Sequence, residues 1–150
     1  MKKVAVLTTF GEAVSGYSLI TVAETQLRMM LDHGYSPIAL VQEGFQEPKL
    51  GDSIWKSSIV DLRPVVPFLH LVNTPGEDFE ERVDLILAGL RVGLADAEVC
   101  ITHDIFFQEW YHEHNVAVRR YAKERPDLLW LHWIHSCVTH PRLDEYRGGV

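Results

Sequence analysis

Two apolar runs of the sequence each end in a histidine followed by a second polar residue. His103 and Asp104 follow one run, and His135 and Ser136 follow another. Open α/β sheets bind ligands at the carboxyl ends of their strands, so these side chains would meet there if the runs are parallel strands. His103 would then hydrogen-bond a substrate hydroxyl, while Asp104 orients it or acts as a base. The alternative is that Asp104 only caps the next helix and His103 is structural.

A third candidate is the loop that precedes the first predicted helix. Gly16, Tyr17 and Ser18 could present backbone N–H groups at a helix N-terminus to an anion such as a phosphate. The alternative is that the glycines only form the turn. The dinucleotide fingerprint G-x-G-x-x-G is absent, which argues against a nicotinamide dehydrogenase.

The remaining histidines give weaker patterns. His132 lies three residues before His135, so in a strand the two side chains point to opposite faces, and we expect His132 to be a core histidine with a hydrogen-bond partner. His112 and His114 fall in the middle of a predicted helix, where a spacing of two separates their faces and disfavours a metal pair.

A metal or nucleophilic centre is not favoured. His103, Asp104, His135 and His140 could converge on zinc or iron, but their spacing matches no known ligand signature, so we expect no metal. Cys137 lies near two of these histidines, yet no nucleophile-elbow pattern surrounds it.

Alternating strands and helices predict an α/β protein with a doubly wound, mostly parallel sheet of about five strands. Ser18 is the expected N-cap of the first helix and Gly34 its C′ residue, and a capping box at 74–77 is expected to begin the second. The predicted strands span 3–10, 37–41, 58–62, 99–102 and 128–134, and the predicted helices span 18–33, 74–94 and 106–123.

The composition narrows the class of protein. The chain has 150 residues, two cysteines and a net charge of −7, which fits one domain in a reducing cytoplasm and argues against nucleic acid as a partner. The first apolar run is too short for a signal peptide, and none reaches the roughly 18 residues of a membrane helix. The fifth strand is apolar on both faces with too little chain after it for a covering helix, so a truncated chain is expected.

The layout resembles the N-terminal domain of GT-B-fold glycosyltransferases, especially the retaining family 4 group. In that family the first loop usually carries a Gly-Gly pair, where this sequence has Ser15-Gly16. The likeness covers most of the chain and rests on short motifs: Val4-Ala5-Val6-Leu7, the loop around Gly16 with its helix ending in His33-Gly34-Tyr35, Ile101-Thr102-His103-Asp104, and Leu131-His132-Trp133-Ile134-His135-Ser136.

The resemblance implies a single Rossmann-like domain over 1–150, the acceptor-binding half of a two-domain enzyme whose donor-binding C-terminal half is absent. His135 would lie against the transferred sugar as a catalytic residue with Asp104, while Gly16, Tyr17, Ser18, His103 and Ser136 would bind substrate. Transfer would proceed with retention and without a metal, the leaving diphosphate helping to deprotonate the acceptor. The nucleotide-sugar would be a co-substrate with no further cofactor, and the chain alone would not turn over.

Two other functions stay open from the residues. One is a small stand-alone α/β hydrolase that uses His103, Asp104 and His135. The other is a non-catalytic binding or subunit module whose fifth strand docks a partner chain.

Overall fold

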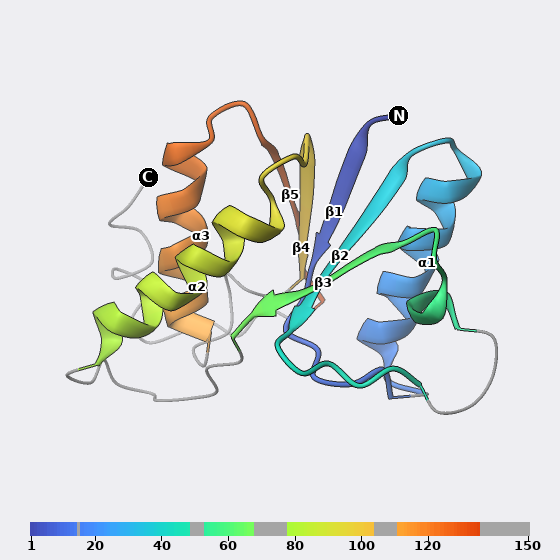
Figure 1. The fold of residues 1–150 in the computed structure, drawn as a ribbon, viewed down its shortest axis with the longest axis horizontal. Helices are drawn as coiled ribbons and strands as arrows, with labels where there is room; N and C mark the ends of the chain where they lie inside the picture. The colour runs from blue at the N-terminus through green and yellow to red at the C-terminus, as the bar shows by residue number, and fades with distance from the viewer. Residues whose placement is uncertain (15, 49–52, 68–77, 104–110, 136–150) are drawn as a thin grey trace.

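The described residues form a five-stranded, all-parallel sheet with helices on both faces (Figure 1). The computed structural model describes residues 1–14, 16–48, 53–67, 78–103 and 111–135. The strands are β1 (Lys3–Leu7), β2 (Ser36–Gln42), β3 (Asp61–Val66), β4 (Val99–His103) and β5 (Leu129–Trp133). The helices are α1 (Ser18–Asp32), the short 3-10 helix η1 (Ile54–Lys56), α2 (Phe79–Gly93) and α3 (His112–Glu124). The predicted doubly wound α/β fold is confirmed.

The strand order is β3-β2-β1-β4-β5, so the chain builds the sheet outward from β1 in both directions. Leu7 at the end of β1 is in register with Leu40 of β2 on one side and Thr102 of β4 on the other. The order therefore reverses between β1 and β4, the place where sheets of this kind bind ligands.

Each face of the sheet carries its own apolar core. On the α1 face, Val6 and Val41 pack with Leu27, and on the other face Leu40 packs with Leu90 and Val118. Figure 1 shows α1 on one side of the sheet and α2 and α3 on the other. Burying each such side chain contributes about 1.5–3 kcal/mol, which fixes the helices over the strands.

The two ends of α1 differ in how well the sequence predicts them. At the C-terminal end Gly34 has φ of 76°, and the N–H groups of Gly34 and Tyr35 donate to the carbonyls of Leu31 and Met30 at 3.0 and 2.9 Å, which is a Schellman motif. The C′ prediction is confirmed. The N-cap prediction is wrong by one residue: Tyr17 is the N-cap because its carbonyl already accepts the first helical hydrogen bond, from the N–H of Thr21 at 3.2 Å.

The third strand lies later in the chain than predicted. β3 begins at Asp61, near the end of the strand predicted at 58–62, and contains Pro64. Because β3 is an edge strand, a proline without an N–H can pair with Val41 on its inner side without removing a hydrogen bond from the sheet interior.

Two predicted helix starts fall on residues whose structure is not described. α2 begins at Phe79 with Asp78 at the N-cap, and the predicted capping box at 74–77 lies outside the described residues. The described part of α3 begins at His112, so the predicted start at 106 also lies outside them.

β5 is an edge strand, and one of its two apolar faces is exposed among the described residues, as expected for an apolar strand with no helix predicted after it. Leu129, Leu131 and Trp133 are 56%, 47% and 50% exposed. Trp130, on the opposite face, packs against the core beside Tyr121 of α3. Within the part of the chain that is described, β5 is therefore covered on one face only.

Candidate functional site

The carboxyl ends of β4 and β5 bring two predicted site residues into contact. His103 is the last residue of β4 and is in register with Trp133, so His135 lies just beyond the end of β5. Nδ1 of His103 lies 2.9 Å from Nε2 of His135, and the rings are stacked with their centroids 5.1 Å apart. His103 is only 6% exposed. The site thus has one enclosed imidazole that positions a second, more exposed one.

The middle of α1 supplies a residue that the sequence analysis missed. Oε1 of Gln26 lies 2.9 Å from Nε2 of His103, so both ring nitrogens of this histidine are engaged. The sequence could have indicated Gln26, because it lies three residues after Ala23 and four before Met30, both of which are buried. A polar residue at such a position of an apolar stripe is a candidate for a buried hydrogen bond.

His132 belongs to the other face of the sheet, as the strand periodicity predicts. Its Nδ1 lies 2.7 Å from Oγ1 of the buried Thr102, so the predicted hydrogen-bond partner is confirmed. The prediction of a core position is wrong, because β5 is an edge strand and the His132 side chain is exposed. Partial desolvation beside the sheet nevertheless lowers the pKa of His132.

The loop that contains Gly16 lies at the N-terminal end of α1. Gly16, Tyr17 and Ser18 are exposed at the start of α1, with the Tyr17 ring edge-on to Phe10. Among the described residues, no side chain caps the first turn of α1 and no acidic residue occupies it. Ser18 precedes Gln26 by eight residues, so about 12 Å of helix separates this N-terminus from the histidine pair.

Two predicted site residues, Asp104 and Ser136, lie outside the described residues, as does His140 of the metal set weighed above. Within 1–14, 16–48, 53–67, 78–103 and 111–135, no three His, Cys, Asp or Glu side chains gather in a way that could hold a metal ion.

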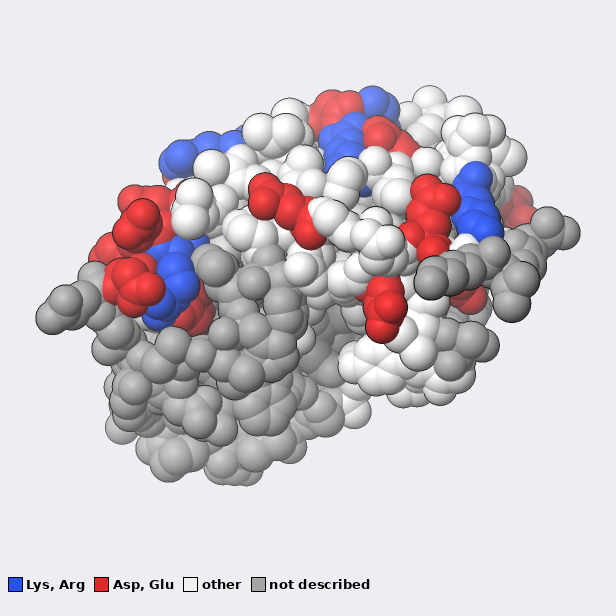
Figure 2. Space-filling model, turned by 60° about the horizontal axis from the view of Figure 1, so that its bottom comes forward, with Lys and Arg blue, Asp and Glu red and all other residues white. Residues whose placement is uncertain are grey.

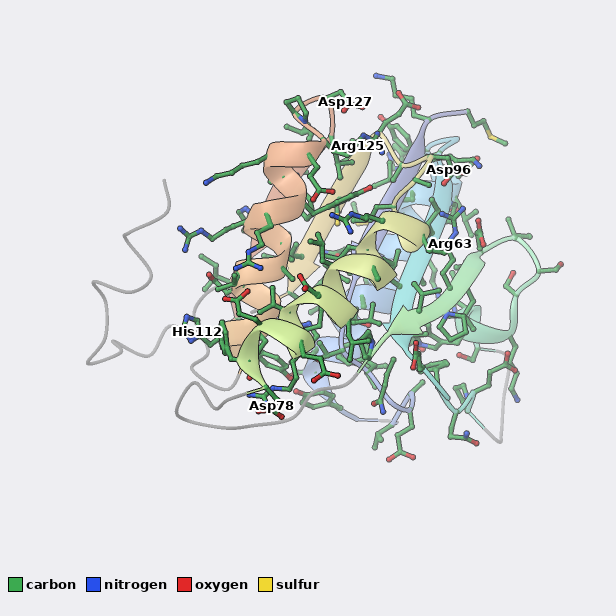
Figure 3. All side chains as sticks on the ribbon, turned by 60° about the vertical axis from the view of Figure 1, so that its left-hand side comes forward. Arg63, Asp78, Asp96, His112, Arg125 and Asp127 are labelled. Atoms are coloured by element: carbon green, nitrogen blue, oxygen red, sulfur yellow. The ribbon has the colours of Figure 1, made fainter. Side chains whose placement is uncertain are left out.

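A second polar cluster, also missed by the sequence analysis, occupies the start of α3. His112 and His114 lie in the first turn of α3 as described, and Glu113, His114 and Asn115 are buried. Arg82 of α2 donates to Oε1 of Glu113 from Nε at 3.0 Å and from Nη2 at 2.8 Å. Figure 3 shows His112 near Asp78, which is also paired with Arg82, at the end of the molecule away from Arg125.

Burial dominates the chemistry of His114. Desolvation lowers its pKa to about 4, and no hydrogen-bond partner from the described residues reaches its Nε2. The Tyr111 ring stands edge-on to it at 5.7 Å, and the Tyr111 hydroxyl accepts a hydrogen bond from Oγ1 of Thr9 at 3.1 Å. His114 is therefore a neutral side chain at neutral pH.

An apolar groove of about 600 Å³ runs between α1 and β5. Met29 and Met30 form one wall, and Leu131 and Trp133 form the other. Gln26 also lines the groove, so the groove adjoins the histidine pair.

Charges on the surface are mixed. On the face shown in Figure 2, basic side chains lie beside acidic ones and form no continuous basic patch among the described residues. Arg63, for example, is paired with Asp61 and Asp96, and Asp96 is also paired with Lys3. These contacts hold the pKa of Asp96 well below its usual range. None of the described helices is long and apolar enough to cross a membrane.

Comparisons with known proteins support the fold. No protein-family model matches the sequence, and no curated protein does. Among solved structures, sucrose-phosphate synthase from Thermosynechococcus elongatus is similar, with a TM-score of 0.56 and 12% identity. The match covers 95% of this chain and 37% of the synthase, so the chain spans little more than a third of that protein. At this identity the likeness establishes the architecture, a Rossmann-like α/β domain of the kind found in half of a GT-B fold.

Proposed function

We propose that this chain is the acceptor-binding half of a glycosyltransferase that takes a sugar from a nucleotide-sugar donor. The observation that carries the proposal is the contact between His103 and His135 at the carboxyl ends of β4 and β5, beside the point where the strand order reverses. The likeness to a sucrose-phosphate synthase over nearly the whole chain supports the same class of enzyme.

In this proposal His135 lies against the transferred sugar and hydrogen-bonds one of its hydroxyl groups. Such a bond accelerates transfer if it strengthens as the anomeric carbon becomes positively charged. His103 is mostly enclosed, and it holds the His135 ring in one orientation through their 2.9 Å contact. Asp104 adds the carboxylate that orients the acceptor hydroxyl.

The N-terminus of α1 would serve the charged part of a ligand. Backbone N–H groups at a helix start carry partial positive charge, which favours a phosphate. Those of Gly16 and Ser18 would serve this role, whereas the N–H of Tyr17 already donates to the Val14 carbonyl at 3.3 Å. Ser136, the next residue in the sequence after His135, would add a hydroxyl to the substrate-binding residues. The donor diphosphate, held mainly by a second domain, would leave with retention of configuration and take up the acceptor proton without a metal, in the cytoplasm.

The proposal is tested by measuring sugar transfer from a panel of nucleotide-sugars with the protein as its gene encodes it. The panel pairs each donor with sugar, sugar-phosphate and lipid-alcohol acceptors. We expect transfer with at least one pair, and a loss of about 100-fold or more in kcat for His135→Ala, because the residue acts on the reacting sugar.

The matched control is His33→Ala. His33 is an exposed histidine at the end of α1 whose Nδ1 lies 2.8 Å from the carbonyl of Met29. This variant should keep the wild-type kcat. Full activity in His135→Ala, or no transfer with any donor, would refute the proposed role.

A further inference from the structure

Gln26 makes a contact that does not serve the packing of α1. Its Oε1 faces Nε2 of His103 at 2.9 Å, while its own Nε2 is enclosed and has no hydrogen-bond partner in the part of the chain that the structure describes. An enclosed amide donor without an acceptor destabilises a fold, so an apolar residue would suit this position better if packing were its only role. The contact with His103 is the interaction that the glutamine gains.

A carbonyl oxygen can only accept a hydrogen bond. Nε2 of His103 must therefore carry a proton to bond Oε1 of Gln26. A neutral imidazole has one ring proton, so Nδ1 of His103 is then an acceptor. The atom opposite, Nε2 of His135, has to donate across their 2.9 Å contact.

We infer that Gln26 is a positioning residue that fixes the tautomer of His103 and, through it, that of His135. In this chain of hydrogen bonds His135 carries its proton on Nε2, so its Nδ1 is the nitrogen of the ring that can accept a hydrogen bond. That the ring acts on a substrate rests on the proposed function. The tautomers are a property of the free protein and can be tested without any transfer reaction.

The test is a two-bond ¹H–¹⁵N correlation spectrum of the ¹⁵N-labelled 150-residue chain at about pH 8.5, roughly two units above the ordinary histidine pKa. Variants His103→Gln and His135→Gln assign the two ring systems. We expect both neutral rings to show the pattern of a proton on Nε2. His33 serves as an internal reference for a ring with its proton on Nδ1, because its Nδ1 donates to the Met29 carbonyl at 2.8 Å.

Substitutions at position 26 then test the cause. Gln26→Leu removes the acceptor, so the Nε2–H pattern of His103 and His135 should be lost in favour of a mixture of tautomers. Gln26→Glu keeps an acceptor oxygen and should retain the pattern. Thr25→Val, on the same helix turn, should leave both spectra unchanged.

Either of two results would overturn the inference. One is a wild-type spectrum in which His135 carries its proton on Nδ1. The other is an unchanged pattern in Gln26→Leu. If Gln26→Leu fails to fold, Gln26→Met provides the same loss of acceptor with a flexible side chain, and the wild-type spectrum still decides the first point.

Discussion

Lowering the pH from 7 to 5 should cost the native chain about 2 kcal/mol of stability through His114 alone. The side chain is 1% exposed, and burial lowers its pKa to about 4 from an ordinary value of 6.5. Protonation in the unfolded chain begins as the pH falls through 6.5, while the folded chain resists it down to about 4. The contribution is therefore fully present above the unfolded pKa and is lost progressively below it.

The magnitude follows from linkage. The pKa of His114 is 6.5 in the unfolded chain and about 4 in the folded chain. At pH 5, protonation therefore shifts the equilibrium between folded and unfolded chains about 30-fold toward the unfolded chain, and at pH 7 it has almost no effect. At 0.59 kcal/mol per natural-log unit, this ratio corresponds to about 2 kcal/mol. The full shift of about 2.5 units would reach roughly 3 kcal/mol at still lower pH.

The assay is urea unfolding followed by tryptophan fluorescence at several pH values between 5 and 7. His114→Leu removes the titrating ring with little change in volume, and it should flatten the pH dependence by about 2 kcal/mol relative to wild type. His33→Leu, which removes an exposed histidine, is the matched control and should leave the wild-type slope. Parallel curves for wild type and His114→Leu would refute the argument from burial.

Two further substitutions test the packing of α2 against β3 and α3. Gly89→Ala should destabilise the fold by about 1–3 kcal/mol in urea unfolding, because a Cβ there would lie 2.2 Å from the Val65 carbonyl oxygen. This loss should exceed the gain from the better helix propensity of alanine. A stabilised variant would contradict the close approach of α2 to β3. Arg82→Leu should cost about 3–5 kcal/mol by leaving the buried Glu113 carboxylate unpaired. The double variant Arg82→Leu/Glu113→Leu should recover most of that loss, and a single-variant cost below about 1 kcal/mol would argue against the buried pair.

The spacing of apolar residues predicts the fold wherever the local preference for helix or strand agrees with burial in the core. The apolar spacing of Ile20, Ala23 and Leu27 is the face that packs on the sheet, and Gly34 has the positive φ that ends α1. Edge strands are less predictable. The pairing of Pro64 and the exposure of Leu131 depend on which strands lie outermost, and the sequence pattern does not encode the strand order.

The sequence likewise predicts only part of the candidate site. Strand ends alone predict that His103 and His135 lie near one another, since parallel strands end at one edge. Gln26 is far from both in sequence, and only the packing of α1 over β4 brings it to His103. The burial of Glu113 and His114 was missed because the polar face of α3 turns toward α2 at its first turn, where Arg82 compensates one charge.

α1 connects the two parts of the proposed site mechanically. Its N-terminus presents the backbone N–H groups proposed to bind phosphate, and about 12 Å further along the same helix Gln26 holds His103. Ile20, Leu27 and Met30 anchor this span on the sheet, so the helix cannot shift at one end alone without breaking that packing. A ligand phosphate that draws the N-terminus of α1 inward should therefore also alter the contact between Gln26 and His103, and the imidazole spectra of His103 and His135 would register that coupling.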